Sequence, residues 1–182
     1  MPVVGSPIPI ALAGSGKTAE AEAAYKEAVA AAPEAYELRY EYAQLLAQGD
    51  KKAEAIDELK QVIQSPDPAV AGAAANLLGR LGAFAECIAG LDRALKTKAN
   101  PDLYVRRGAC RHGLNDDAGA LKDYQAAVEA DPNFAPGHYY LGRHYLATGK
   151  KKEAKTHLAK AAELGAGTPL EAAAKKALAE IK

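Results

Sequence analysis

The chain lacks tryptophan altogether, and among its 182 residues it has only two phenylalanines, one methionine and two cysteines. Two cysteines cannot form a framework of several disulfides or a zinc site built from cysteines. No apolar run approaches the roughly 20 residues of a membrane-spanning helix, so we expect no membrane insertion. Alanine, in contrast, occupies 43 positions. Because alanine has the highest helix propensity, this composition predicts an all-α protein.

The chain has no net charge, since 23 basic residues balance 23 acidic ones. It therefore lacks the dominant basic face of a nucleic-acid binder, and we expect no nucleic-acid partner. The charge is nevertheless unevenly divided. Residues 1–91 carry 7 basic and 12 acidic side chains, a balance of −5, and residues 92–182 carry 16 and 11, a balance of +5. This division fits a groove whose second half prefers acidic partners, two ends that attract each other, or surface variation without function.

Proline recurs at intervals of 33 or 35 residues along the chain. Each of these prolines precedes a helix-like segment, where the fixed φ and the missing N–H do no harm at the first helical position. Asp67 and Asn100 stand directly before two of them as predicted N-caps, and Thr168 with Glu171 reads as a capping box. The recurring prolines are Pro33, Pro68, Pro101, Pro136 and Pro169.

Helix breakers recur midway between the prolines, 33 or 34 residues apart. They suit tight turns between antiparallel helices, so each repeat is predicted to be a helix, a turn and a second helix. The breakers are Gly16, Gly49, Gly82, Asn115 and Gly149.

The second helix of each repeat carries small, large and small residues at i, i+4 and i+7, which is one helix face. The small residues predict a close approach of the neighbouring helix. Gly108 and Gly142 take the close-contact position in two first helices, where glycine costs about 0.5–1 kcal/mol relative to alanine unless tight packing offsets it. The series begins with Ala21, Ala55, Cys87, Ala120 and Ala154, and continues with Tyr25, Leu59, Leu91, Tyr124 and Leu158.

The spacing of these residues resembles the tetratricopeptide repeat family over residues 17–167. The best match is the fifth repeat, through His138, Leu141, Gly142, Tyr145, Gly149, Ala154 and Leu158, with His138 in place of the usual tryptophan. The resemblance implies an all-α, right-handed α-solenoid of about five helix-turn-helix repeats with a C-terminal capping helix.

We accordingly divide the chain into three parts. Residues 1–16 are expected to be an irregular segment or a degenerate first helix, residues 17–167 the repeat array, and residues 168–182 the capping helix. The repeats are placed at about residues 1–32, 33–66, 67–99, 100–133 and 134–167.

No motif supports catalysis, a metal or a cofactor. The string from Ala11 to Thr18 matches a relaxed phosphate-binding loop, with alanine in place of the first glycine. Such a loop needs a preceding strand, which Pro9 interrupts. We therefore interpret this segment as a turn between helices. The hypothesis of a nucleotide-dependent enzyme is supported by Lys17 alone. The four histidines do not form the i, i+4 pair with a glutamate that a helical zinc site shows. We expect no enzymatic activity.

Arg107 stands where leucine is usual in the first helix of the fourth repeat. The segment resembles a family variant in which this arginine pairs with an aspartate of the second helix, here Asp123. The resemblance implies a partly buried structural ion pair.

In tetratricopeptide repeats the first helices line a concave groove that receives a peptide or a partner helix. The resemblance places eight residues of this chain there, and their tyrosines and arginines are types that often carry binding energy. The arginines favour an acidic segment or a terminal carboxylate. The lysine–asparagine pair of the chaperone-tail clamp is absent, so no co-chaperone function is assigned. The groove residues are Tyr40, Gln44, Asn76, Arg80, Arg106, His112, Tyr139 and Arg143.

The leading hypothesis is a non-enzymatic protein–protein interaction scaffold that binds a peptide or partner protein, with an acidic segment as one candidate, in this groove. The alternative is a self-associating module that assembles through its acidic N-terminal and basic C-terminal halves. A cytoplasmic location is the default expectation, and a periplasmic one stays open.

Overall fold

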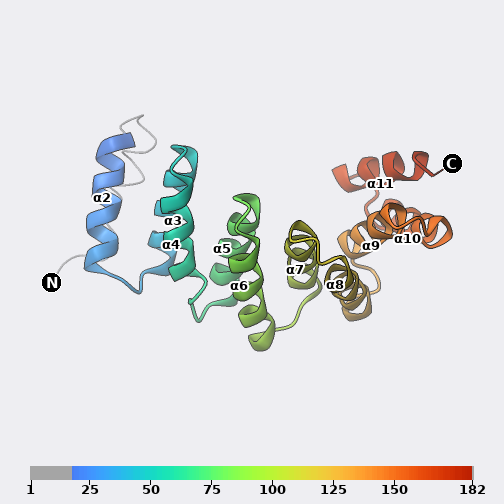
Figure 1. Cartoon of the computed structure of the whole chain (residues 1–182), viewed down its shortest axis with the longest axis horizontal. Helices are drawn as coiled ribbons and strands as arrows, with labels where there is room; N and C mark the ends of the chain where they lie inside the picture. The colour runs from blue at the N-terminus through green and yellow to red at the C-terminus, as the bar shows by residue number, and fades with distance from the viewer. Residues whose placement is uncertain (1–17, 182) are drawn as a thin grey trace. The chain divides into compact units, whose positions relative to one another are not determined.

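The structure is a computed structural model that describes residues 18–181. In this part of the chain there are ten α-helices and no strand (Figure 1). The all-α prediction is therefore confirmed. Lys17 and the degenerate first helix expected before it lie outside the described residues.

The chain divides into two compact units, Met1–Gly90 and Leu91–Lys182, called here the first and the second unit. The helix α6 contains the boundary. In order, the helices are α2 (Thr18–Ala31), α3 (Tyr36–Gln48), α4 (Lys52–Val62), α5 (Pro68–Arg80), α6 (Phe84–Thr97), α7 (Pro101–Gly113), α8 (Asp117–Ala130), α9 (Ala135–Ala147), α10 (Lys151–Leu164) and α11 (Pro169–Ala179).

Consecutive helices pack as hairpins, with α3 on α4, α7 on α8 and α9 on α10 (Figure 1). The turns between hairpin helices each contain one residue with a left-handed backbone. These residues are Asp50 (φ 60°), Gly82 (77°), Asn115 (61°) and Gly149 (76°). Three of them are the predicted breakers. In the remaining turn the left-handed residue is Asp50, one position after Gly49, which is possible because aspartate tolerates this region better than most residues do.

Two predicted N-caps are present. The Asp67 carboxylate accepts a hydrogen bond from the Ala69 N–H at 2.8 Å, and the Asn100 side-chain oxygen accepts one from the Leu103 N–H at 3.0 Å. Each cap satisfies one of the orphan donors at a helix start, while a proline occupies the first helical position. Pro33 differs from this pattern because α3 begins only at Tyr36.

The predicted capping box at α11 forms with one change. Thr168 Oγ1 accepts from the Leu170 N–H at 3.3 Å, as an N-cap does. Glu171 reaches back to the N–H of Gly167 at 2.8 Å, one residue before the cap. This bond and the adjacent Lys175 ammonium lower the pKa of the Glu171 carboxyl, with Lys175 the larger cause. The glutamate thus fixes the chain before the helix rather than the cap itself.

The small–large–small series forms the core of the hairpins. The small residues that begin it are all fully buried, and so are the three leucines that follow four positions later. A Cβ added at Gly108 would lie 2.6 Å from the Tyr124 ring, and one at Gly142 would lie 2.8 Å from Leu158 Cγ. Both glycines therefore permit a helix approach that alanine would obstruct. The residues fully buried in this way are Ala21, Ala55, Cys87, Ala120, Ala154, Leu59, Leu91 and Leu158.

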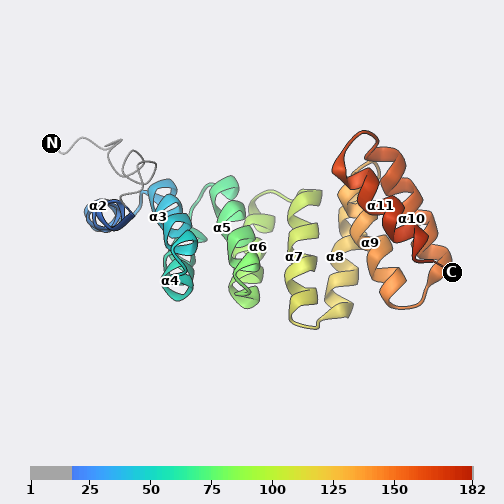
Figure 2. The same cartoon turned by 90° about the horizontal axis from the view of Figure 1, so that it is seen from above.

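The helix α11 packs on α10 and α9 in the second unit (Figure 2). It buries Ala174 and Ala177 completely, while Leu170 and Leu178 are half-buried. This is the position expected for a helix that covers the last apolar face of a repeat array.

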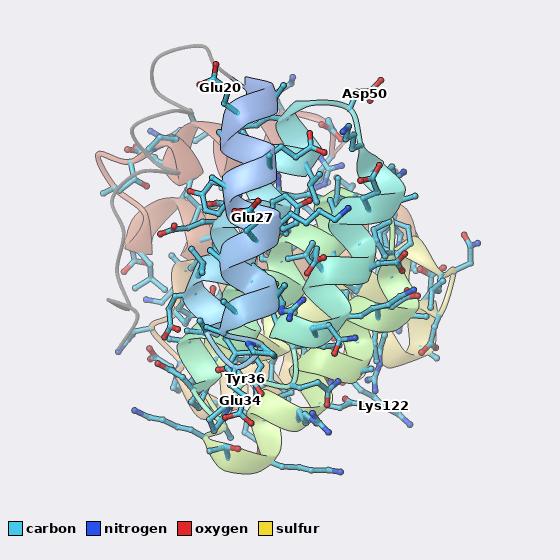
Figure 3. All side chains as sticks on the ribbon, turned by 90° about the vertical axis from the view of Figure 1, so that its left-hand side faces the viewer. Glu20, Glu27, Glu34, Tyr36, Asp50 and Lys122 are labelled. Carbon is cyan, nitrogen blue, oxygen red and sulfur yellow. The ribbon has the colours of Figure 1, made fainter. Side chains whose placement is uncertain are left out.

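The first unit carries a set of exposed carboxylates on and around α2 and the α3–α4 turn. Figure 3 shows Glu20, Glu27, Glu34 and Asp50 of this set, all of them exposed. Within residues 18–181 no helix combines the length and the apolar character that crossing a membrane requires.

Candidate binding groove in the second unit

The second unit contains a groove of about 440 Å³ between α7 and α9, with α8 behind it. We call it the α7–α9 groove. Figure 2 shows the three helices that form it. Its size is in the range of natural ligand pockets. It is lined by Ala109, His112, Asp117, Tyr124, Tyr139, Tyr140, Arg143, His144, Ala147 and Thr148.

Aromatic rings from α8 and α9 pack against one another in this lining. Tyr124 stacks on Tyr140 with ring centroids 5.7 Å apart, and the edge of Tyr139 meets Tyr140 at 5.4 Å. His144 meets Tyr124 edge-on at 6.2 Å. Tyr124 is buried, but Tyr140 is 38% exposed. The groove therefore offers a prearranged aromatic surface for an apolar or aromatic side chain.

The charged groups of the lining have identifiable partners. His112 Nδ1 donates to the Asp117 carboxylate at 2.7 Å, and both side chains are largely exposed. Arg143 Nη1 lies 3.7 Å from Oε1 of Glu180, which follows α11. At that separation the two half-exposed side chains form an ion pair without a direct hydrogen bond. Most of the Arg143 donors thus remain available to a ligand.

Burial changes the acid–base properties of two lining residues. It lowers the pKa of His144, which Lys150 and His112 lower further against the opposing influence of Asp117. His144 is therefore neutral at pH 7. Burial also raises the pKa of the Tyr124 hydroxyl, so this hydroxyl stays protonated. Neither group adds a charge to the groove near neutral pH.

An ion-pair network joins α7 to α8, the two helices that line the groove together with α9. Arg107 donates from Nε and Nη2 to the Asp123 carboxylate, the shortest contact being 2.6 Å, and from Nη1 to Asp92 of α6 at 2.7 Å. Arg111 reaches the second oxygen of Asp123 at 3.0 Å. The Asp123 side chain is only 3% exposed. The structure thus places Arg107 against Asp123, the two residues that the sequence paired.

A histidine pair ties α9 to α10 on the other side of α9. His138 is buried, and its Nε2 donates to the Pro132 carbonyl at 3.0 Å. In the tautomer of His138 that carries its hydrogen on Nε2, the other ring nitrogen accepts, so His157 Nδ1 donates to His138 Nδ1 across 3.0 Å. Burial, and the proximity of His138, lower the pKa of His157. The His157 ring is therefore neutral at pH 7, and its contact with His138 joins α10 to α9.

Two family models, both described as tetratricopeptide repeat, match residues 10–70 and 101–134. The chain belongs to the tetratricopeptide repeat family. A curated relative, the TPR repeat-containing thioredoxin TTL4 of Arabidopsis thaliana, is 29% identical over 120 residues. These residues make up 65% of this chain but only 17% of that protein.

Solved tetratricopeptide repeat structures share the fold. MamA superimposes with a TM-score of 0.69 at 20% identity, covering 88% of this chain and 95% of MamA. YrrB, described as a TPR protein with an unusual peptide-binding site, gives 0.65 at 21% identity over 92% and 88% of the two chains. The first TPR of Spaghetti (RPAP3), bound to an HSP90 peptide, gives 0.57 at 23% identity over 63% and 89%.

Of the eight groove residues expected from the tetratricopeptide repeat register, the structure brings together three in the α7–α9 groove, namely His112, Tyr139 and Arg143. Arg106 does not line it, and pairs along α7 with Asp102 at 2.6 Å. The remaining four lie on helices of the first unit, where their role stays a prediction. They are Tyr40 and Gln44 on α3, and Asn76 and Arg80 on α5.

Sequence reasoning missed several lining residues. Tyr124 lies on α8, the second helix of its repeat, and belongs to the small–large–small series. Its position in the sequence therefore indicated a core residue rather than a binding residue. Tyr140 and His144 stand next to predicted groove residues on α9, and neighbouring positions on a helix point in different directions. Among residues 18–181 no group of three or more histidine, cysteine, aspartate or glutamate side chains could hold a metal ion.

Proposed function

We propose that the chain is a non-catalytic protein-interaction module that binds an extended peptide segment of a partner protein in the α7–α9 groove. The observation that carries the proposal is the groove itself, in which an aromatic surface adjoins Arg143. Tyrosine and arginine are enriched among residues that dominate binding energy, because they combine large contact area with directional hydrogen bonds.

The volume and the openness of the groove to solvent suit a few residues of a peptide. Tyr140, His112 and Arg143 are exposed, so a ligand reaches them without any rearrangement of the core. Two proteins of the same fold support this proposal by analogy, namely YrrB, which has an unusual peptide-binding site, and the first TPR of Spaghetti, which is bound to an HSP90 peptide.

The polar groups of the groove favour binding over catalysis. The His112–Asp117 pair is exposed, whereas catalytic acid–base pairs depend on burial to adjust their pKa values. The hydroxyl of Thr148 donates to the carbonyl oxygens of His144 and Tyr145, at 3.0 and 3.2 Å. It is thus occupied by its own helix end rather than by a histidine base.

The proposal is tested by obstructing the groove. Ala147 lines it and is exposed, so Ala147→Trp fills space without disturbing the core. The probe is a labelled library of hexapeptides with random sequence, captured on immobilised protein. We expect the wild type to retain a subset of peptides and Ala147→Trp to lose most of that subset.

Ala179→Trp is the matched control, because Ala179 is an exposed residue at the end of α11 that does not line the groove. It should capture the same peptides as the wild type. Equal capture by the wild type and Ala147→Trp, or no capture by either, would contradict the proposed function.

A further inference from the structure

The α7–α9 groove carries a permanent positive charge at Arg143. Among the lining residues it is the side chain whose positive charge is permanent, since arginine does not deprotonate in proteins. His144 is neutral there because burial lowers its pKa. Asp117 already accepts a hydrogen bond from His112. A ligand that meets Arg143 therefore meets a cation with free donors.

The partner of Arg143 within the chain is itself a carboxylate. Glu180 follows the last residue of α11, a helix that packs on α9, and its oxygen lies 3.7 Å from Arg143 Nη1. The two side chains are 48% and 49% exposed. Exposed ion pairs at such a distance are weak, so an incoming carboxylate with direct, forked geometry replaces Glu180 readily.

We propose that Arg143 selects peptides that place an acidic side chain in the α7–α9 groove, and that Glu180 is an internal competitor for Arg143 in the unliganded protein. This inference rests on the peptide-binding function proposed above and adds the ligand's chemistry to it. The acidic side chain pairs with Arg143, while a neighbouring residue of the peptide contacts the Tyr139–Tyr140 surface.

The arrangement makes Glu180 and Arg143 interdependent. Removing the charge of Glu180 frees Arg143 and strengthens the binding of acidic peptides. Removing the charge of Arg143 abolishes the preference for acidic peptides, and the state of Glu180 then no longer matters. This coupling distinguishes a competitor from a residue that merely stabilises α11.

The experiment uses acetylated and amidated hexapeptides, so that neither terminus contributes a charge. One position is fixed as Glu, Gln or Lys, and the others are mixtures of uncharged residues. The best-captured Glu peptide and its Gln counterpart are then measured by fluorescence anisotropy at about pH 7.5, where His144 is neutral. An additional Gln peptide with a free C-terminal carboxylate tests the other source of this charge.

For the wild type we expect a preference for Glu over Gln of about two- to fivefold, the range of a solvent-exposed ion pair. Glu180→Gln should increase this preference about twofold on the same reasoning. Arg143→Gln should remove it, and the double variant should match Arg143→Gln. Lys176→Gln and Glu129→Gln, which change exposed charges outside the groove, should behave as the wild type.

Each contrary result has a distinct meaning. If Glu and Gln peptides bind equally while Ala147→Trp abolishes capture, the proposed function stands and the selection by Arg143 is wrong. If only the free C-terminal carboxylate is preferred, the assignment to an acidic side chain is wrong. If Glu180→Gln changes nothing although Arg143→Gln does, Glu180 is not a competitor. If Ala147→Trp captures as the wild type does, the groove is not the binding site at all.

Discussion

Asp123 shows how much depends on a single buried charge. Its carboxylate is almost inaccessible to water and is neutralised by Arg107 and Arg111. Arg107→Leu removes three of the hydrogen bonds to this carboxylate and leaves it with Arg111. We expect the free energy of unfolding to fall by about 2–4 kcal/mol, near the lower end for a broken buried pair because one partner remains. Urea denaturation followed by far-UV circular dichroism measures this loss.

The adjacent Arg106 supplies the control for that experiment. Its partner Asp102 is 51% exposed, and the pair lies along one helix face. Exposed pairs of this kind contribute little, so Arg106→Leu should change the free energy of unfolding by less than about 1 kcal/mol. An Arg107→Leu protein as stable as the wild type would show that the buried network is not a stabilising element.

These two arginines also show which side-chain contacts can be predicted from the sequence and which cannot. Arg107 could be paired with Asp123 because the family variant fixes their spacing. Arg106 was expected in the groove from its register alone, but whether a side chain lies against its own helix or over a groove depends on which carboxylates are nearby. Tyr124 was indistinguishable from a core residue, since one of its faces does pack in the core.

At the scale of helices, the histidine pair makes the contact of α9 with α10 sensitive to pH. The folded protein holds His157 neutral, because burial and His138 lower its pKa, while the unfolded chain protonates it at about pH 6.5. The unfolded state therefore binds more protons between these two pKa values, and stability falls as the pH is lowered through that window. Thermal unfolding between about pH 7.5 and pH 5 should show a decreasing Tm.

His157→Gln tests this assignment, because glutamine does not titrate and its amide can still donate to His138. The variant should lose part of the pH dependence below about pH 6.5. A wild type and a His157→Gln protein with the same slope of Tm against pH would contradict the role of the pair.

The sequence predicted helix starts and close helix contacts correctly at positions where the local geometry requires one type of residue. The caps Asp67 and Asn100 are polar acceptors before a proline, and few other roles fit that pattern. Gly108 and Gly142 were recognisable because glycine inside a helix needs a compensating close contact. Gly49 lies in the α3–α4 turn, as the sequence predicted, but the residue with the left-handed backbone is the neighbouring Asp50, which the spacing of the glycines could not indicate.

For the whole chain, the uneven division of charge predicts association that depends on salt. The first unit has a balance of −5 and the second +5. The exposed acidic residues of the first unit include Glu27 and Glu34 (Figure 3). The exposed basic residues of the second unit include Lys152 and Lys155. Two copies can therefore attract through unlike units. Because the screening length falls from about 30 Å at 0.01 M salt to about 8 Å at 0.15 M, such attraction is strong only in dilute buffer.

Light scattering should accordingly give a mean mass above 19.0 kDa at about 0.01 M salt and a return toward 19.0 kDa at about 0.15 M. Replacing Lys152 and Lys155 by glutamine should weaken the association at low salt, because it reduces the positive charge of the second unit. Replacing Glu27 and Glu34 by glutamine should weaken it as well, because it reduces the negative charge of the first unit. Reversing the charges at all four positions leaves balances of only −1 and +1 on the two units, and it should therefore weaken the association more than either replacement by glutamine. A mass of 19.0 kDa at every concentration and salt would eliminate self-association, and a mass that grows with salt would indicate apolar surface instead.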